Sequence, residues 1–489
     1  MNPDKSTQSP PATLKEKAAK GLFWGGVNTF FQQFIGAILG ILALHVLNPD
    51  DYGLMGMLAI FTAIATGIMD SGFGTALINK KDIRHEDYNA VFWFSAITGT
   101  ALYVIFFFAS PLIAHFYHQP LLTDLSRLAF LSFLINSFGL VHNAYLFKTL
   151  MAKERAKIDI TAVSISGVAV LVLAINGFSY WSLAIQSILQ SGISVLLRWH
   201  YTPWKPTLGR IDFSPLKTMF GFGSRLFITN IFTHVNIHIL SVILGKYHTE
   251  EQVGYYTQGS KWMQLVNFMV YGMITSVALP VFVETNNDKE RQCHIFRKMI
   301  RFGAFISFPS LFGLAFVSRE FILIFAGEKW VGCIPFLQVL CLYGGFFYLI
   351  SLYIYLLYAY GKSGIVMWYN ITISAIVLCF ILLIIPYGIF PAIVAYVVIL
   401  TSSIFGWHYF ARKLIALRFT IVLKDIFPYL FITLFSFGLT WLITLPVENI
   451  YVIFFLKIII AAAIYLLIMK YSGSAVFQES VNFLLKKRK

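Results

Sequence analysis

The sequence predicts an all-α polytopic membrane protein with about fourteen transmembrane helices, and three observations lead to this fold class. First, 58% of the 489 residues are hydrophobic and only 12% are charged, with a mean hydropathy of +0.74. Soluble domains carry roughly 25% charged residues, so most of this chain must face lipid. Second, the apolar residues form runs of the length that crosses a bilayer. Third, Lys and Arg are concentrated in alternate connections between these runs.

The apolar runs define the elements in chain order. They predict spans at residues 22–46, 53–78, 90–114, 125–148, 158–176, 179–198, 217–245, 255–283, 302–324, 333–358, 365–386, 389–411, 425–445 and 450–470. These group into a cytoplasmic N-terminal segment (1–21), a lobe of six helices (22–200), a second lobe of six (217–411), two further helices (425–471) and a basic cytoplasmic tail (472–489).

The basic residues predict the orientation. Cytoplasmic loops carry the excess of Lys and Arg, and here the outer loops hold only Lys246, Arg319 and Lys329 of the 37. Both termini are therefore expected in the cytoplasm. The net charge of +15 is explained as an orientation signal, and we expect no nucleic-acid partner.

Motifs for catalysis, cofactors or metals are missing. Gly361 and Lys362 resemble the end of a P-loop, but position 356, where that motif needs glycine, is Leu356. His234 and His238 have a spacing used by metal sites, yet no third ligand is evident. The four cysteines show no metal-binding or disulfide pattern. We therefore expect no enzyme activity, no cofactor and no metal.

Two segments of the chain repeat one layout. Residues 48–55 and 249–256 each follow a long apolar helix and combine an acidic turn with a glycine, Gly53 or Gly254, that opens the next helix. Six predicted spans separate corresponding points, so the halves run parallel and are related by an axis along the membrane normal. Repeats of this kind are typical of transporters, with the substrate path between the halves.

Polar side chains inside the spans are the candidates for a substrate-binding cavity, because an ionisable group there costs on the order of 3 kcal/mol. Spacings of three and four residues place several of them on shared helix faces. They also have ordinary explanations, as contacts between helices or, near a helix end, as anchors to lipid headgroups. Two cations would favour an anionic substrate, such as a diphosphate or a carboxylate. The candidates are Arg225, Lys261, Asp70, Asn28, Gln32, Asn143 and Gln258.

Two further features have expected roles at the membrane interface. Lys457 lies near the outer end of its span and is expected to be a surface anchor. The tyrosines of span 333–358 are expected on all faces of their helix, as interface anchors or, less strongly indicated, as sugar-stacking groups.

Four motifs together resemble a known family. They are KAAKGLFWG at residues 17–25, LNPDDYG at 47–53, MDSGFGTALI at 69–78 and VGYY at 253–256. They resemble the Wzx-type flippases of the multidrug/oligosaccharidyl-lipid/polysaccharide exporter superfamily, above all the branch associated with colanic acid and teichuronic acid export. The resemblance covers the membrane-embedded core and becomes vague after about residue 300.

The resemblance implies two six-helix lobes around a central cavity that opens alternately to each side of the bacterial inner membrane. The substrate would be an undecaprenyl-diphosphate-linked oligosaccharide, a repeat unit of exopolysaccharide, O-antigen or capsule, flipped from the cytoplasmic to the outer leaflet. The implied partners are membrane lipids, a coupling ion (proton or sodium) and a polymerase with other glycan-assembly proteins. The alternatives are a drug/cation antiporter of the same superfamily, which would need acidic residues facing the cavity, and a membrane-embedded glycan enzyme.

Overall fold

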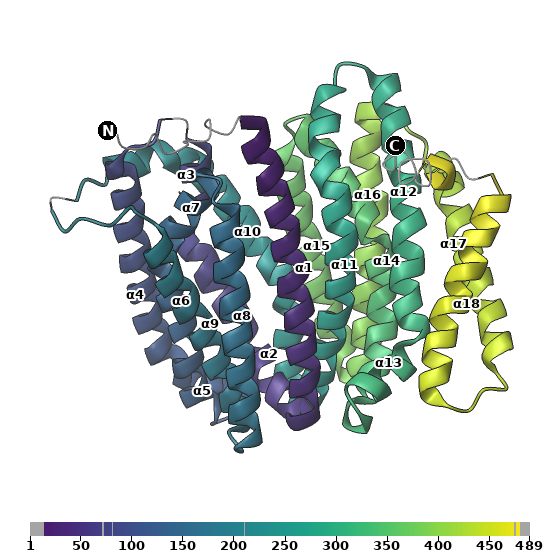
Figure 1. Ribbon diagram of the computed structural model, residues 1–489, viewed down its shortest axis with the longest axis horizontal. Coiled ribbons are helices and arrows are strands. Elements are labelled where there is room, and N and C mark those ends of the chain that lie inside the picture. The colour runs from purple at the N-terminus through teal and green to yellow at the C-terminus, as the bar shows by residue number, and fades with distance from the viewer. Residues whose placement is uncertain (1–13, 71–72, 81, 210, 474–475, 480–489) are drawn as a thin grey trace, which may run out of the picture. The chain divides into compact units, whose positions relative to one another are not determined.

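The protein is built from helices, as the sequence predicts. The computed structural model describes residues 14–70, 73–80, 82–209, 211–473 and 476–479; at some positions, chiefly in α1 and α10, it describes the backbone alone. Within these residues there are eighteen α-helices, two 3-10 turns and no strand (Figure 1). In a bilayer every backbone N–H and C=O must be satisfied inside its own segment, and helices achieve this.

The helices follow the predicted spans closely. Their bounds are α1 Leu14–Val46, α2 Pro49–Asp70, α3 Phe73–Asn79, α4 His85–Tyr117, α5 Leu122–Ala129, α6 Leu131–Ser137, α7 Leu140–Lys148, α8 Ala152–Ile175, α9 Ser179–Tyr201, α10 Ser214–Tyr247, α11 Glu250–Glu284, α12 Lys289–Phe316, α13 Ser318–Phe325, α14 Cys333–Ala359, α15 Ser363–Ile384, α16 Ile389–Ile415, α17 Phe419–Thr444 and α18 Ile450–Tyr471; the 3-10 turns are η1 Glu328–Trp330 and η2 Ile385–Tyr387.

Twelve of these segments are long and apolar enough to cross a membrane, and a bent pair of helices makes a thirteenth. The remaining predicted span coincides with α10, whose described part includes a shorter apolar helix, Ile237–Tyr247. The chain is therefore a multi-pass membrane protein.

Several spans are broken where the sequence suggests continuous helices. The span predicted at 125–148 is divided into α5, α6 and α7, with a bend of 42° between Leu122–Ser137 and Leu140–Lys148. Gly139 lies at this bend, where an added Cβ would meet the Val195 side chain at 2.7 Å, so a larger residue would not fit. The span at 302–324 is likewise divided into α12 and α13, and α12 begins earlier, at Lys289, because Asp288 caps its first turn.

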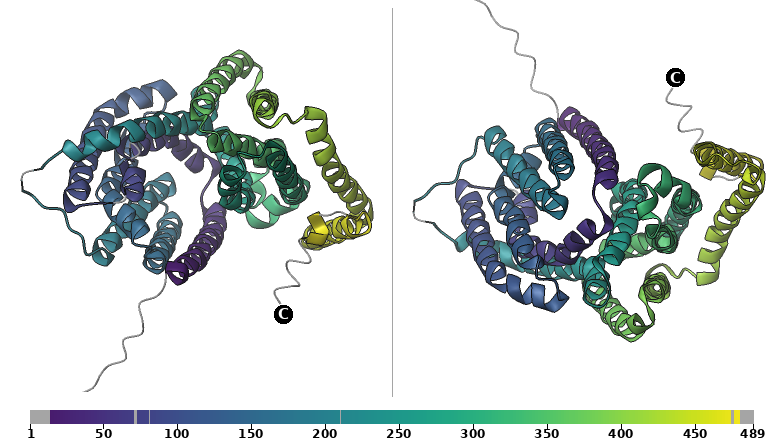
Figure 2. Two further views of the ribbon diagram at one scale, coloured as in Figure 1. Left: turned by 90° about the horizontal axis from the view of Figure 1, so that it is seen from above. Right: turned by 90° about the horizontal axis from the view of Figure 1, so that it is seen from below.

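Residue contacts divide the chain into two compact units. The first comprises Met1–Val46 and Phe61–Ile231, and the second Leu47–Ile60 and Phe232–Lys489. The division falls inside α2 and α10, so each of these helices contributes to both units. At the edge of the second unit, α17 and α18 lie side by side and pack on α12 and α13 (yellow in Figure 2).

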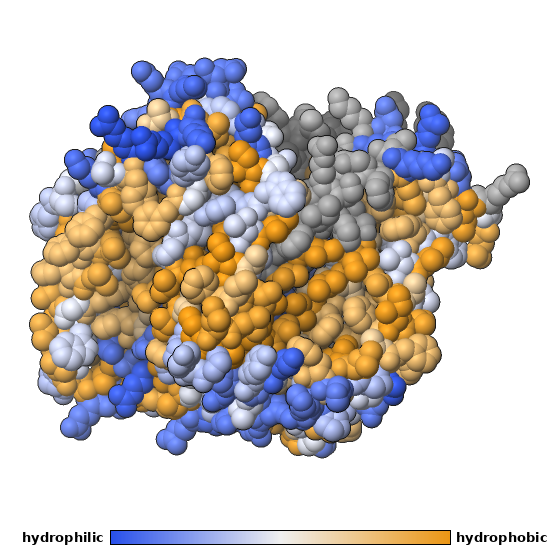
Figure 3. All heavy atoms as spheres, turned by 180° about the vertical axis from the view of Figure 1, so that it is seen from behind, coloured by the Kyte–Doolittle hydropathy of each residue, from blue (hydrophilic) through white to orange (hydrophobic). Residues whose placement is uncertain are grey.

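Apolar side chains form a belt on the surface of the helices. Figure 3 shows hydrophobic residues over the middle of the helices and hydrophilic residues gathered near their ends. Many large apolar side chains are exposed, including Phe108, Leu112 and Ile459. Such exposure is expected where lipid covers the surface.

The two repeated turns contact each other inside the second unit. A Cβ built on Gly53 would lie 1.9 Å from the Glu250 carbonyl oxygen, and one built on Gly254 would lie 1.9 Å from the Pro49 carbonyl oxygen. Pro49 and Glu250 occupy corresponding positions of the two repeats. The contact is therefore reciprocal: each helix begins against the glycine of the other, and only glycine allows this backbone approach.

Aromatic side chains surround this crossing of α2 and α11. Trp330 is fully buried, with its ring centroid 5.4 Å from that of Tyr52 and 6.3 Å from that of Tyr255. The Tyr255 hydroxyl donates to the Lys329 carbonyl oxygen at 3.1 Å. Burial lowers the pKa of the Lys329 ammonium, an effect that the nearby Asp51 carboxylate opposes. The 3-10 turn after α13 thus covers the crossing.

Replacing Gly254 with alanine should destabilise the fold by about 1–3 kcal/mol, since the new methyl group overlaps a backbone atom that cannot move alone. Thermal unfolding of the purified protein in detergent measures the effect. Gly272→Ala on the same helix is the matched control, because nothing lies within 4 Å of a Cβ at that position. Equal melting temperatures for the two variants would contradict the close approach.

Candidate functional site

A charged cluster lies among α1, α8 and α9 of the first unit. The Asn28 amide donates to one carboxylate oxygen of Asp159 at 2.9 Å, and an Arg198 nitrogen lies 3.9 Å from the other. The side chains of Asp159 and Arg198 are only 19% and 18% exposed. Losing one partner of an ion pair that is largely removed from water is costly, because the other charge then remains buried without compensation.

Arg155 gives this cluster a net positive charge. It lies one helical turn before Asp159 on α8, and its guanidinium carbon is 4.0 Å from the centroid of the Phe147 ring. Its Nε is buried without a hydrogen-bond partner. The Asp159 carboxylate thus pairs with Arg198, Arg155 adds a second positive charge near it, and a buried donor of Arg155 remains to be satisfied. Such an arrangement favours an anionic ligand.

The hairpin of α8 and α9 explains why these residues meet. The two helices are antiparallel and joined by a short turn, so the first turns of α8 lie beside the last turns of α9. On the other side, α1 packs closely on α8: a Cβ at Gly167 would meet the Leu39 side chain at 2.4 Å. This approach brings Asn28 within reach of Asp159.

The predicted site residues of the first unit are only partly brought together. Asn28 belongs to the charged cluster, and Gln32 lies one turn further along α1, half-buried. Asn143 lies on α7, also half-buried. The side chains of Asp70 and Arg225 lie outside the described residues.

The predicted residues of the second unit differ from each other in exposure. Lys261 is exposed, with its ammonium nitrogen 6.0 Å from the centroid of the Tyr52 ring beside the glycine crossing. Gln258 is 1% exposed, and both polar atoms of its side chain are buried without a hydrogen-bond partner. The spacing on α11 places the two side chains near one another, but they have different surroundings.

Lys457 is not a surface anchor, contrary to the sequence-based expectation. Its ammonium group pairs with Glu320 of α13 at 2.8 Å, and the two side chains are 12% and 10% exposed. A hydropathy pattern reveals an interior charge but not its partner on another helix, and here that partner changes the role. The pair connects α18 to α13.

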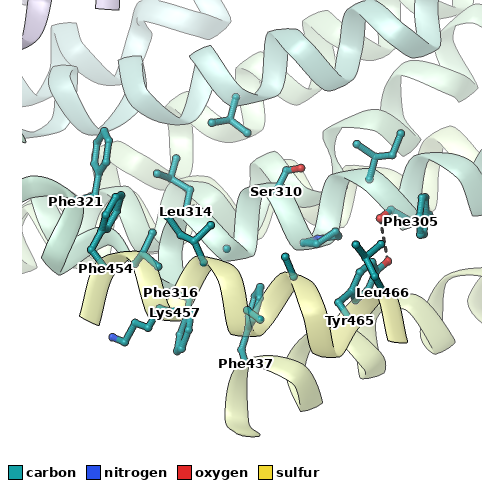
Figure 4. A pocket seen from close by; sticks show the side chains of 18 residues that line it. Phe305, Ser310, Leu314, Phe316, Phe321, Phe437, Phe454, Lys457, Tyr465 and Leu466 are labelled. Atoms are coloured by element: carbon teal, nitrogen blue, oxygen red, sulfur yellow. Dashed lines mark hydrogen bonds between the residues drawn. The ribbon is translucent and has the colours of Figure 1, made fainter. Parts of the chain in front are cut away.

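An apolar cavity lies beside this ion pair. Its volume is about 550 Å³, and it is lined by α12, α13, α17 and α18 together with Val266 (Figure 4). Phe316, Leu314 and Phe454 contribute to a nearly uninterrupted apolar wall, with Lys457 at its edge. At another point of the lining, the Tyr465 hydroxyl donates to the Phe305 carbonyl oxygen at 2.9 Å. The cavity can hold a hydrocarbon chain but offers few partners for a polar ligand.

No group of three or more metal-ligating side chains is found among the described residues. His238 lies in the described part of α10, and the side chain of His234 lies outside it.

Comparison with known proteins identifies the family. A family model described as "Polysaccharide biosynthesis protein" matches residues 41–335, more than half of the chain. The chain belongs to this family. The matched region includes the glycine crossing and the whole charged cluster except Asn28.

Members of the polysaccharide biosynthesis family are also found among curated relatives. The chain is 26% identical over 335 residues to the teichuronic acid biosynthesis protein TuaB of Bacillus subtilis (strain 168), covering 68% of this chain and 69% of TuaB. It is 25% identical over 338 residues to the lipopolysaccharide biosynthesis protein WzxC of Escherichia coli (strain K12), covering 68% of each. The family resemblance seen in the sequence is thus confirmed.

Solved structures show the same fold. The lipid II flippase MurJ in an inward closed conformation matches with a TM-score of 0.73 at 15% identity, covering 92% of this chain and 99% of MurJ. An inward-facing multidrug resistance MATE family transporter of the MOP superfamily matches with a TM-score of 0.64 at 15% identity, covering 80% and 98%. The family member described here therefore has the fold that these two transporters share.

The sequence interpretation missed Asp159 as the centre of the charged cluster. The signal was present, because Asp159 is an acidic residue just inside the predicted span 158–176 and follows Arg155 by one turn. The positions of Arg155 and Arg198 near span ends favour cytoplasmic connections instead, since basic residues commonly lie there.

Replacing Asp159 with asparagine should lower the free energy of unfolding by about 1–3 kcal/mol, because two arginines then lack a counter-charge. The change keeps the shape of the side chain. Thermal unfolding in detergent measures its effect on stability. Asp124→Asn is the control, since Asp124 is 76% exposed and its contact with Arg127 contributes little. If both variants melt alike, Asp159 does not hold the cluster together.

Replacing Lys457 with methionine should cost about 3–5 kcal/mol, since Glu320 would remain buried without a counter-ion. Lys298→Met, at an ion pair whose side chains are 51% and 55% exposed, should change stability far less. Urea or thermal unfolding of the detergent-purified variants compares them. An effect at Lys457 as small as that at Lys298 would contradict the buried pairing.

Proposed function

We propose that this protein is a flippase, a transporter rather than an enzyme, that carries an undecaprenyl-diphosphate-linked oligosaccharide across the bacterial inner membrane. The observation that carries the proposal is the net-positive cluster of Arg155, Arg198 and Asp159 in a chain of the polysaccharide biosynthesis family. A diphosphate is an anion that guanidinium groups bind well. The names of TuaB, WzxC and MurJ agree with this class of substrate.

The drug/cation antiporter is the second candidate, and its support is the MATE-like fold. Such a transporter would need an unpaired acidic residue to bind a cation. In the described part of the membrane helices, Asp159 and Glu320 are each paired with a basic side chain. This argues for an anionic substrate.

The parts of the substrate can be assigned to parts of the chain. With both termini in the cytoplasm, the charged cluster would lie near the cytoplasmic ends of α8 and α9, where a diphosphate enters from the inner leaflet. Arg225 and Lys261 would supply further positive charge, with Asp70, Asn28, Gln32, Asn143 and Gln258 as polar neighbours. The polyprenyl chain would occupy the apolar cavity between α12 and α18.

Transport would proceed by alternating access between two lobes, at residues 22–200 and 217–411, with residues 425–471 as an addition. In this topology the glycine crossing of α2 and α11 lies at the outer face. We assign it as a gate that is closed here and must open to release the glycan. A proton or sodium gradient could drive the cycle, and a polymerase would receive the product.

A flipping assay tests the function. Purified protein in liposomes, with a fluorescent undecaprenyl-diphosphate oligosaccharide and a probe of outer-leaflet exposure, should flip the lipid faster than empty liposomes. Arg198→Gln should slow flipping about tenfold or more, because it removes a charge-assisted contact with the diphosphate. Lys261→Ala and Arg225→Ala should slow it as well.

Lys298→Gln is the control, since Lys298 lies in an exposed ion pair with Glu479 and is not part of the cluster. Flipping that survives all the arginine and lysine substitutions would leave the function standing and refute the binding residues. Absence of flipping, together with efflux of a cationic dye, would establish the antiporter instead.

A further inference from the structure

The tyrosines of α14 are sorted by the structure into two groups. Tyr348 and Tyr353 are buried in the core, where the Tyr353 hydroxyl bonds to a His408 ring nitrogen. Tyr343, Tyr355 and Tyr358 are half-buried instead. At 3.6 residues per turn, these three and Phe347 fall within about one third of the helix circumference.

α11 presents a matching face beside this one. Ser260, Gln264, Asn267 and Tyr271 follow each other at spacings of four, three and four residues, so they line one side of the helix. The Gln264 amide donates to the Ser260 hydroxyl at 2.8 Å. The hydroxyls of Tyr271 and Tyr355 lie 2.8 Å apart and join the two helices. We call these eight residues the tyrosine–amide strip: Ser260, Gln264, Asn267 and Tyr271 of α11 with Tyr343, Phe347, Tyr355 and Tyr358 of α14.

Aromatic contacts continue along the strip. The ring centroid of Phe347 lies 5.8 Å from that of Tyr343 and 5.8 Å from that of Tyr271, and the Tyr355 and Tyr358 centroids are 6.2 Å apart. The strip extends from residue 260 to residue 271 on α11 and from residue 343 to residue 358 on α14, which is roughly 15–25 Å at the rise of an α-helix. It therefore covers much of the thickness of the hydrocarbon core.

The middle of the strip contains a polar atom that the fold leaves unsatisfied. Asn267 is at the centre of α11 and is 8% exposed, and its side-chain oxygen is buried without a hydrogen-bond partner. A buried acceptor without a partner costs stability, and at this depth lipid cannot satisfy it. A polar ligand would give this oxygen a hydrogen-bond donor, and so would a water molecule that the ligand then displaces.

The strip differs from a lipid-facing surface. Among the exposed side chains of α11 are three large apolar ones, Phe268, Met269 and Met273, which are 63%, 52% and 53% exposed. The strip instead combines aromatic rings, mostly from α14, with the amides and the serine hydroxyl of α11. None of its residues is charged at neutral pH, so it is also a poor site for a diphosphate.

We propose that the tyrosine–amide strip binds the sugar part of the lipid-linked substrate, an inference that rests on the proposed function. One face of a pyranose ring presents C–H groups that pack on an aromatic ring, while its edge presents hydroxyls. Tyrosine and amide side chains serve both needs, since each has donors, acceptors or an apolar face. The charged cluster of α8 and α9 would then select the diphosphate, and the strip would select the glycan.

Native mass spectrometry of the purified full-length protein tests this division. The probes are undecaprenyl diphosphate and the lipid-linked oligosaccharides extracted from the producing bacterium, whose bound adducts differ in mass. Asn267→Leu and Tyr355→Phe should each weaken binding of the oligosaccharide lipid about five- to tenfold, the effect of one lost hydrogen bond, and leave undecaprenyl diphosphate unchanged. Tyr348→Phe is the control on the same helix. It removes a buried hydroxyl that has no hydrogen-bond partner, so it should change the binding of neither lipid.

Melting temperatures separate a binding role from a structural one. Asn267→Leu should be as stable as the wild type or more so, because it removes an unsatisfied buried amide. Loss of stability with equal weakening of both lipids would show that Asn267 only packs helices, and would overturn the proposal. Unchanged binding of the oligosaccharide lipid would overturn it too. If the wild type binds neither lipid, the proposed function itself fails.

Discussion

The reciprocal contact of Gly53 and Gly254 is the constraint on which the second unit depends most. Each glycine lies against the first residue of the opposite helix, so that α2 and α11 begin at one shared point. Because the contact is between backbones, it fixes the positions of both turns and of the aromatic cover around Trp330. The contact also explains why the start of α2 belongs to the same compact unit as α11, although about 200 residues separate them in the sequence.

Paired charges provide the next level of organisation within each unit. In the second unit, Asp425 of α17 accepts two hydrogen bonds from Arg297 of α12, at 2.7 and 3.1 Å, and Lys457 of α18 pairs with Glu320 of α13. The last two helices are thus fastened at two places, with the apolar cavity among them. In the first unit the cluster around Asp159 has an excess of positive charge. In the second unit, Asp425 likewise has a second arginine nearby, Arg301 at 3.8 Å, so a carboxylate with an excess of positive charge around it occurs in both units.

The sequence is sufficient to predict the fold class, the positions of most spans and the repeated turn, because lipid imposes apolar runs of one length and glycine marks a close backbone approach; of the fourteen predicted spans, twelve or thirteen meet the length and apolarity of a membrane helix. It is less informative about the interior. The bend at Gly139 depends on Val195 of another helix, and the role of Lys457 depends on Glu320. Arg198 is interpreted as a charge in a connection until its ion pair with Asp159 is known. The half-buried face of α14 likewise becomes visible only when its neighbours are known.

We propose that the crossing of α2 and α11 opens during transport. Gly56 and Thr257 directly follow the two repeats, at corresponding positions, and contact each other across the crossing. A Cβ built on Gly56 is 3.5 Å from the Thr257 Cβ, a separation that a disulfide spans. The most direct measurement is flipping in liposomes by the Gly56→Cys/Thr257→Cys double variant, before and after oxidation, with each single variant as control. Oxidation should stop flipping by the double variant alone, and reduction should restore it. Undiminished flipping with the disulfide formed would contradict the account.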